Sequence, residues 1–301
     1  MSASKPWPVV ILRRLAAVLM PALLCVMGII MFENKLLYFP AKYPAGFWEP
    51  ELMGLRVEDY YFYSEDRTRL HAWYAPARQG RVTLLYCHGN AGNLSYAVDH
   101  IKGLVRLGVN VLIFDYRGYG RSQGKPDEAG LYKDANAAYQ FLMHTGRGDP
   151  RQLIIYGQSL GGVVAAHLAA RQKCAGLIVE SSFTSAQDMA RELYPWLPVR
   201  WLIKSRLDAA AAVGKVRAPV LVLHGTRDRT VPFRLGRRLF ERAEEPKFFH
   251  GVENADHNDV YVVGGRSYYA KLEEFIFSLA IPLAMLEPST QSSHGEYKDE
   301  S

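Results

Sequence analysis

Leu-Ile-Ile-Tyr-Gly-Gln-Ser-Leu-Gly-Gly, residues 153–162, joins a short apolar run to residues 163–170, which are typical of a buried helix. The β-branched and aromatic residues predict a strand that stops at Gly157. Small residues at such a turn let strand and helix pass closely, so that Ser159 is lifted clear of the sheet. The helix N-terminus behind it favours developing negative charge. Ser159 is therefore a candidate nucleophile.

Strands and helices alternate along the rest of the chain, which is typical of a doubly wound α/β domain with a mostly parallel sheet. We expect this domain to cover residues 56–284 and to be followed by a polar, disordered tail, 285–301. Its first two strands, 56–64 and 70–75, should form a hairpin. Further strands are expected at 81–87, 109–115, 176–180, 220–224 and 247–252, and helices at 94–107, 126–144, 233–243 and 267–281.

The N-terminus contains an uncharged apolar run, residues 15–32, which is long enough to span a membrane as a helix. We expect residues 1–33 to be a single-pass anchor and 34–55 to be a linker. The alternative is a cleaved signal peptide, but no small-x-small cleavage site follows the run. More basic residues precede the run than follow it, which favours a domain on the non-cytoplasmic side.

Residues 181–218 interrupt the alternation of strands and helices with a longer excursion between two strands. Its apolar part, residues 194–203, is rich in tryptophan, proline and leucine. Two interpretations are open: an ordinary packed helix, or a small cap that carries apolar side chains over the site or contacts the bilayer.

A serine attacks only if a base takes its proton and an acid orients that base, so we searched the later strand ends for both. Asp228 follows the strand 220–224, and His257 follows the last strand. Taken singly, these are ordinary turn and loop residues. Together with Ser159 they stand in an order known from catalytic triads, at the sheet edge where ligands bind.

The oxyanion of an acyl-transfer intermediate needs backbone N–H donors. We predict that the N–H groups of Asn90 and Leu160 supply them, because Leu160 follows the candidate nucleophile and Asn90 lies in a glycine-containing loop after a strand. Ala91 is the alternative to Asn90.

Other polar residues near these strand ends are expected to support loops rather than to react. His88 should hold the loop that contains Asn90, and Asp115 and Arg117 should stabilise the loop after their own strand. Asp256 and Asp259 flank His257, where they can influence its pKa.

The composition excludes several classes of protein. The net charge is +6 and the basic residues are scattered, which argues against nucleic-acid binding. Cys25, Cys87 and Cys174 show no disulfide pattern, and no histidine or cysteine cluster has metal-ligand spacing. We expect no metal and no cofactor.

Six segments carry a resemblance to a known family: 87–93, 115–124, 157–162, 180–184, 224–232 and 255–259. Through them the chain resembles the α/β-hydrolase superfamily, and within it the membrane-associated α/β-hydrolase-domain serine hydrolases, a group that includes protein depalmitoylases. The resemblance implies an α/β-hydrolase fold in which Ser159, Asp228 and His257 are nucleophile, acid and base. Depalmitoylating members are tethered through a cysteine-rich N-terminus, whereas the N-terminus of this chain contains only Cys25, so their role is not carried over.

These observations predict a membrane-anchored serine hydrolase that cleaves carboxylic esters or thioesters through an acyl-enzyme on Ser159. The apolar anchor and residues 194–203 favour an acyl ester or a lipid-like small molecule as substrate. The alternatives are a serine peptidase or amidase with the same fold, and a non-catalytic membrane docking protein. The sequence leaves the identity of the substrate and the oligomeric state open.

Overall fold

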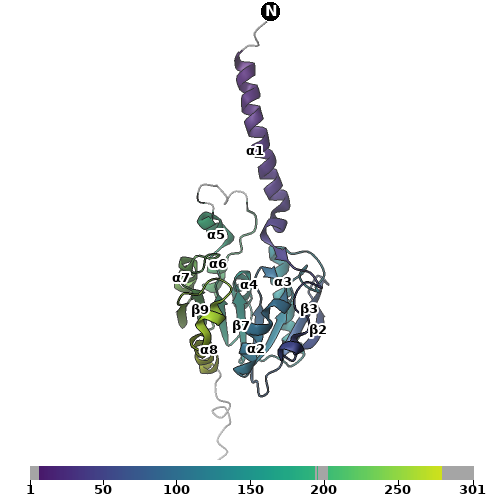
Figure 1. Cartoon of the computed structure of the whole chain (residues 1–301), viewed down its shortest axis with the longest axis vertical. Coiled ribbons are helices and arrows are strands. Elements are labelled where there is room, and N and C mark those ends of the chain that lie inside the picture. The colour runs from purple at the N-terminus through teal and green to yellow at the C-terminus, as the bar shows by residue number, and fades with distance from the viewer. Residues whose placement is uncertain (1–6, 194, 196–202, 280–301) are drawn as a thin grey trace, which may run out of the picture.

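The computed structural model describes residues 7–193, 195 and 203–279, and its centre is a twisted, mostly parallel sheet (Figure 1). The strand order is β10-β9-β8-β7-β4-β6-β3-β2. Strand β3 pairs antiparallel with both β2 and β6, and the other neighbours are parallel, as the sequence predicts. The strands are β2 (Glu58–Tyr63), β3 (Arg69–Ala75), β4 (Val82–Cys87), β6 (Val109–Phe114), β7 (Leu153–Gln158), β8 (Gly176–Glu180), β9 (Val220–Gly225) and β10 (Lys247–Val252).

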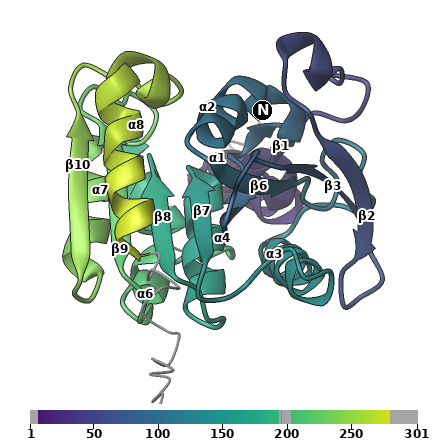
Figure 2. The ribbon, with the colours of Figure 1, turned by 90° about the horizontal axis from the view of Figure 1, so that it is seen from below.

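Helices cover both faces of the sheet (Figure 2). One face packs against α2 (Val98–Arg106) and α8 (Val260–Leu279). The opposite face packs against α3 (Glu128–His144), α4 (Leu160–Ala169), α6 (Ala209–Val213) and α7 (Phe233–Arg242). The doubly wound α/β architecture expected from the sequence is confirmed.

Strand β4 shows why the central strands read as continuous apolar runs. Every residue of β4 is buried. Successive side chains of a strand point to opposite faces, so Leu85 and Cys87 enter the core under α3 and α4, while Leu84 and Tyr86 enter the core under α2 and α8. With helices on both faces, neither set can be polar.

Helices α2 and α3 begin later than expected: α2 starts at Val98 rather than at residue 94, because residues 94–97 form a 3-10 turn. Helix α3 starts at Glu128 because the side chain of Asp127 accepts a hydrogen bond from the N–H of Gly130 and caps the helix. Helix α8 consists of two parts, because Gly265 adopts non-helical backbone angles, φ 47° and ψ −126°, and separates them. The second part corresponds to the helix expected from residue 267, whereas the first part, which begins at Val260, was not predicted.

The excursion between β8 and β9 contains α5 (Ala186–Leu193) as well as α6. Most of the apolar segment 194–203, namely 194 and 196–202, lies outside the described residues, as does the expected tail, 285–301.

The chain enters the domain through α1 (Trp7–Leu37), which extends away from the body in Figure 1. The following residues lie on the domain: Tyr38 is buried, and β1 (Phe39–Pro40) pairs with β5 (Ala91–Gly92). Two short 3-10 helices, η1 (Pro50–Met53) and η2 (Leu94–Ala97), complete the described elements.

The helices within the described ranges include none with both the length and the apolar character that crossing a membrane requires. The expectation that residues 15–32 span a membrane is therefore not supported by the structure.

Candidate active site

Ser159 lies in a strained turn between β7 and α4, with φ 53° and ψ −119°. Few residues other than glycine adopt a positive φ, and such strain persists only where the surroundings impose it. The N–H of Ser159 donates to the carbonyl of Glu180 at 2.8 Å. The hydroxyl of Ser182 donates to the carbonyl of Ser159 at 2.7 Å. These two bonds hold the serine at the tip of the turn.

The glycines on either side of Ser159 are required by close backbone contact. A Cβ atom at Gly157 would overlap the carbonyl oxygen of Gly161, and a Cβ atom at Gly161 would overlap the carbonyl oxygen of Cys87. Strand β7, helix α4 and the end of β4 therefore approach one another as the sequence pattern predicts.

Ser159, His257 and Asp228 come together at the carboxyl end of the parallel strands. The Oγ atom of Ser159 lies 3.0 Å from Nε2 of His257, and Nδ1 of His257 lies 2.8 Å from Oδ2 of Asp228. His257 and Asp228 are both buried. With a proton on Nδ1, this geometry lets Nε2 accept the serine proton while Asp228 holds the ring.

Asp228 is held as a carboxylate by several donors. Its Oδ1 atom accepts from the N–H groups of Thr230 and Val231 at 2.9 and 2.7 Å. Burial by itself raises the pKa of Asp228, but hydrogen bonds from His224 and His257 outweigh it and hold that pKa well below its ordinary value. The carboxylate is therefore available to orient the imidazole of His257.

His224 holds the predicted acid in place, a role that was not predicted from the sequence. This fully buried residue lies in β9, four residues before Asp228, and its Nε2 atom is 3.2 Å from Oδ2 of Asp228 and 2.9 Å from the carbonyl oxygen of Val231. Helix α7 approaches its ring so closely that a Cβ atom at Gly236 would overlap Nδ1. The available signal was its place near the end of a strand, four residues before the predicted acid.

The two predicted oxyanion donors lie beside Ser159 at the same cavity. Within the described residues, no loop, turn or side-chain hydrogen bond uses the backbone N–H of Asn90 or Leu160. The side-chain amide of Asn90 donates to the carbonyl of Leu37 at 2.6 Å, and the hydroxyl of Tyr119 donates to the carbonyl of Asn90 at 2.9 Å. The alternative donor, Ala91, pairs with β1.

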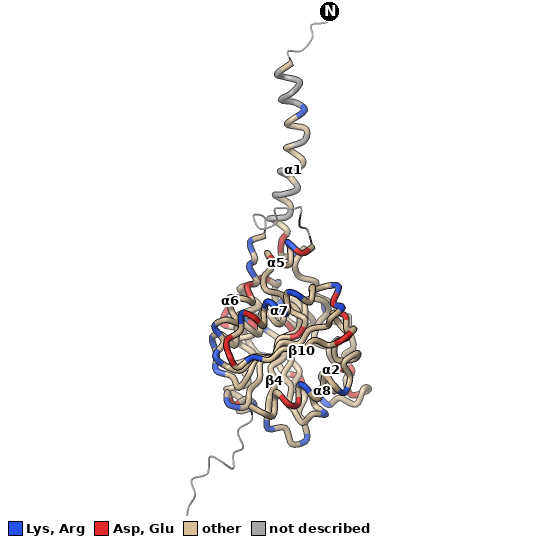
Figure 3. The backbone as a smooth tube through the Cα atoms, turned by 90° about the vertical axis from the view of Figure 1, so that its left-hand side faces the viewer, with Lys and Arg blue, Asp and Glu red and all other residues tan. Residues whose placement is uncertain are grey.

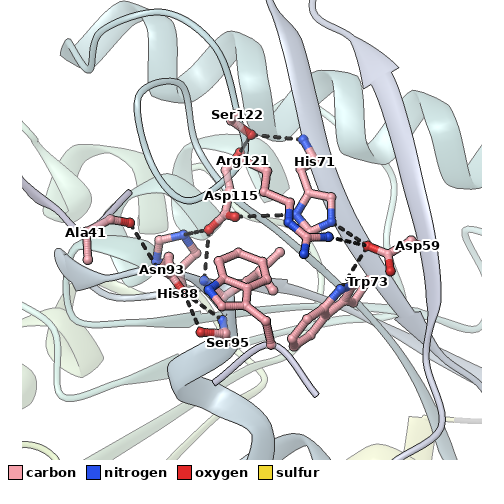
Figure 4. Close-up of polar contacts among 12 residues, drawn as sticks. Ala41, Asp59, His71, Trp73, His88, Asn93, Ser95, Asp115, Arg121 and Ser122 are labelled. Carbon is pink, nitrogen blue, oxygen red and sulfur yellow. Dashed lines mark hydrogen bonds and ion pairs between the residues drawn. The ribbon is translucent and has the colours of Figure 1, made fainter. Parts of the chain in front are cut away.

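A buried polar cluster lies behind this loop (Figure 4). Asp115 is fully buried, and its Oδ1 atom accepts from the N–H of Leu94 at 2.8 Å and lies 3.7 Å from Nε2 of His88. Its Oδ2 atom lies 3.5 Å from Nδ1 of His71, and the other ring nitrogen of His71, Nε2, lies 2.6 Å from Oδ1 of Asp59. Burial lowers the pKa of His88, so its ring is neutral. His88 and Asp115 thus support the loop.

Arg117, in contrast, lies away from Ser159. Its guanidinium donates to Asp134 at 2.7 Å and to Asp66 at 2.9 Å, and so ties the loop after β6 to α3 and to the β2–β3 turn.

The loop that carries His257 is built by its two aspartate neighbours. Asp256 accepts from the N–H of His257 at 2.8 Å and from the N–H of Arg229 at 2.9 Å, and Asp259 accepts from the N–H of Asp256 at 2.7 Å. Both carboxylates therefore position the loop. Across the described ranges, no three histidine, cysteine, aspartate or glutamate side chains converge as metal ligands.

Comparisons with known proteins identify the family of the chain. A family model described as the alpha/beta hydrolase fold matches residues 82–211. Alpha/beta hydrolase domain-containing protein WAV2 of Arabidopsis thaliana is 31% identical over 276 residues, which cover 82% of this chain and 88% of that protein. The chain belongs to the α/β-hydrolase family. An uncharacterized protein of Mycobacterium tuberculosis is 37% identical over 260 residues, covering 84% of this chain and 92% of that protein.

Solved structures share the fold of this α/β-hydrolase. An esterase of Pyrococcus furiosus superposes with a TM-score of 0.66 at 21% identity and covers 80% of this chain and 98% of its own. A puromycin-hydrolyzing peptidase of Mycobacterium tuberculosis superposes with a TM-score of 0.61 at 20% identity, covering 75% of this chain and 39% of that one. At these identities the likeness concerns the fold alone.

The α/β-hydrolase has a cavity of about 990 Å³ over Ser159 and His257, and its two sides differ in character. The apolar lining residues come mainly from the end of α1 and from the segment 183–207, and the polar lining residues come mainly from strand ends, from α2 and from the beginning of α8. Among the described lining residues there is no aspartate, glutamate, lysine or arginine. The apolar side is lined by Leu36, Leu37, Phe39, Phe183, Met189, Leu193, Ile203 and Leu207, and the polar side by Tyr86, Asn93, His100, Gln158, Asn258 and Tyr261.

Proposed function

We propose that this α/β-hydrolase is a serine hydrolase that cleaves carboxylic esters or thioesters of apolar acyl groups. The observation that carries the proposal is the hydrogen-bonded series from Ser159 through His257 to Asp228, at distances of 3.0 and 2.8 Å. Such a series activates a hydroxyl that is otherwise a weak nucleophile.

The reaction proceeds in two halves. The Oγ atom of Ser159 attacks the acyl carbonyl while His257 takes its proton, and Asp228 stabilises the resulting imidazolium. The N–H groups of Asn90 and Leu160 stabilise the oxyanion. The alcohol or thiol then leaves with the proton from His257. Water, deprotonated by His257, attacks the acyl-enzyme, and the proton returns to Ser159 as the acid departs.

The apolar side of the cavity supports an acyl chain as the group that is transferred. It lies between the end of α1, represented by Leu36 and Leu37, and α5, represented by Met189 and Leu193. Burial of apolar surface stabilises binding by about 0.8 kcal/mol per methylene. Because α5 belongs to the excursion 181–218, we assign this segment the role of a small cap over the acyl chain.

We further propose that α1 holds the enzyme at a membrane, with the catalytic domain on the non-cytoplasmic side. Large apolar side chains of α1 are exposed, Leu19 by 63% and Met31 by 71%. Charged residues are instead spread over the body (Figure 3). The full-length protein should float with lipid vesicles in a density gradient, and protein that stays at the bottom of the gradient would refute this assignment.

Labelling with a fluorophosphonate probe tests the serine mechanism, because the probe reacts with activated serines. The wild type should be labelled and Ser159→Ala should not. Ser278→Ala, in the last turn of α8, is the matched control and should label as the wild type does. A folded wild type that does not react would remove the proposal and favour a non-catalytic docking protein.

A peptidase or amidase is the second candidate, since the puromycin-hydrolyzing peptidase has this fold with a TM-score of 0.61. Matched ester and amide substrates with the same acyl group separate the two. We expect the ester to be cleaved faster; a higher kcat/KM for the amide would favour the second candidate.

A further inference from the structure

The polar side of the cavity offers hydrogen-bonding groups that the protein itself does not use. Gln158 directly precedes Ser159, Asn258 directly follows His257, and Tyr261 lies in the first turn of α8; all three line the cavity. Among the described residues, no hydrogen bond uses Nε2 of Gln158, the side-chain amide of Asn258 or the hydroxyl of Tyr261. These groups are therefore free to bind a substrate next to the reacting atoms.

A buried chain of hydrogen bonds fixes the amide of Gln158. Its Oε1 atom accepts from the hydroxyl of Tyr86 at 3.1 Å, and that hydroxyl lies 3.0 Å from Nδ1 of His100. The Nε2 atom of His100 lies 2.9 Å from the hydroxyl of Tyr268, which contacts the carboxyl of Glu180 at 2.5 Å. Since Tyr86 occupies the oxygen of the Gln158 amide, the nitrogen of that amide faces the cavity.

Residues from α8 and α2 close this side of the cavity. The ring of Tyr261 stacks on that of His100, with ring centres 4.8 Å apart and planes 14° apart. Complete burial lowers the pKa of His100 to about 3, so the imidazole is uncharged at neutral pH. The polar side thus combines a fixed amide donor, a second amide and a phenol without a formal charge.

We propose that this polar side binds the leaving group of the ester, and that the leaving group is an uncharged alcohol that carries further hydroxyl groups. This inference rests on the proposed ester hydrolysis. The acyl chain occupies the apolar side, and the alcohol oxygen departs with the proton from His257. The further hydroxyls bind Nε2 of Gln158 and the side chains of Asn258 and Tyr261, which makes Gln158 a specificity-determining residue.

Because the described lining residues include no lysine or arginine, the cavity does not suit a phosphorylated leaving group. A phosphate in the cavity would lose its hydration without gaining a cationic partner, which is costly. An ethyl leaving group would instead make no hydrogen bond to the half-buried Gln158 and Tyr261 or to the exposed Asn258, and a site that hydrogen-bonds a substrate hydroxyl discriminates against analogues that lack it.

The test compares three esters of decanoic acid that differ only in the leaving group: the 1-glyceryl, the 1-glyceryl 3-phosphate and the ethyl ester. For the full-length wild type, we expect kcat/KM for the glyceryl ester to exceed both others by about tenfold or more. Equal or faster cleavage of the phosphorylated ester, or of the ethyl ester, would overturn the proposal.

Gln158→Leu removes the amide at similar size, and we expect it to lower the glyceryl-to-ethyl ratio of kcat/KM by about tenfold. Gln123→Leu, at an exposed glutamine outside the cavity, should keep the wild-type ratio. An unchanged ratio in Gln158→Leu would refute the role of Gln158. Fluorophosphonate labelling of both variants distinguishes this failure from that of the serine mechanism, because a protein that neither labels nor cleaves any of the esters lacks an activated serine.

Discussion

The side-chain amide of Asn90 donates a hydrogen bond of 2.6 Å to the carbonyl oxygen of Leu37. This contact joins the loop beside Ser159 to the end of α1. Pairing of β1 with β5 continues the connection, and the carboxylate of Glu33 accepts from the N–H groups of Lys204 and Ser205 at 3.0 and 2.8 Å. The end of α1 is therefore part of the catalytic domain rather than a free tether.

Replacement of Asn90 by alanine tests this connection. Asn90→Ala leaves the carbonyl of Leu37 without its donor, which should lower the free energy of unfolding by about 1–3 kcal/mol. The loop also holds a proposed oxyanion donor, so kcat should fall by about tenfold. Asn34→Ala, at an exposed position of α1, is the control for urea unfolding and ester hydrolysis, and equal values for the two variants would contradict the assignment.

His224 should protect the carboxylate of Asp228 against acid. The lowered pKa of Asp228 contributes stability that is present above the ordinary aspartate pKa and is lost as the pH falls through the lowered value. His224→Leu removes one donor and raises that pKa, so the acid-unfolding midpoint should move upward, by about one pH unit.

His224→Gln retains a donor and should restore part of the acid resistance. The measurement is circular dichroism along an acid titration, together with kcat at neutral pH, which should be lower in His224→Leu than in His224→Gln. If both variants unfold at the wild-type pH, His224 does not act on Asp228.

Replacement of Gly161 by alanine should lower the free energy of unfolding more than the same replacement of Gly146. A Cβ atom at Gly161 would overlap the carbonyl oxygen of Cys87, so Gly161→Ala must displace β4 or α4 and should cost about 4 kcal/mol or more. Gly146→Ala introduces only backbone strain, at φ 68° with open space around it, and should cost about 1–2 kcal/mol. Urea unfolding measures the stability of both variants. Similar losses of stability would show that the close contact between Gly161 and the carbonyl of Cys87 does not determine the cost of the substitution.

Glu180 should make the stability of the protein fall with rising pH. Burial raises the pKa of its carboxyl above the ordinary glutamate value, and this effect outweighs the hydrogen bond from Tyr268, which lowers that pKa. The stability associated with the neutral carboxyl is complete below the ordinary pKa and is lost as the pH rises through the raised value.

Glu180→Gln keeps an acceptor for Tyr268 and removes the charge. Its melting temperature relative to the wild type should therefore increase as the pH rises from the ordinary glutamate pKa toward the raised value. Glu273→Gln, at an exposed position of α8, should show no such trend. A constant difference for Glu180→Gln would contradict the raised pKa.

Much of the fold could be predicted because its signals are local. Continuous apolar runs such as β4 and β9 indicate strands that are covered on both faces, and the glycines around Ser159 indicate the turn. The second part of α8 could be predicted from residue 267, whereas the short first part, from Val260 to the break at Gly265, could not, since packing against the sheet stabilises it.

Some residues of the candidate site could likewise be predicted from the sequence, and others could not. Ser159, Asp228 and His257 could be proposed from order and position alone, because parallel strands bring their carboxyl ends to one edge of a sheet. Glu180 and the Tyr86–His100 pair could not, since their importance comes from contacts between residues that are distant in the chain. His224 lies only four residues before Asp228, but its contact with that carboxylate became evident only in the structure.

By itself, the sequence determined the alternation of strands and helices, the turn at Ser159 and the order of the three candidate catalytic residues. Each depends on residues close together in the chain or on a general property of parallel sheets. Only the tertiary structure decided that the end of α1 lines the cavity, that the cavity has an apolar and a polar side, and that Gln158 turns its amide nitrogen inward. These features arise from packing between distant segments, which no local pattern encodes.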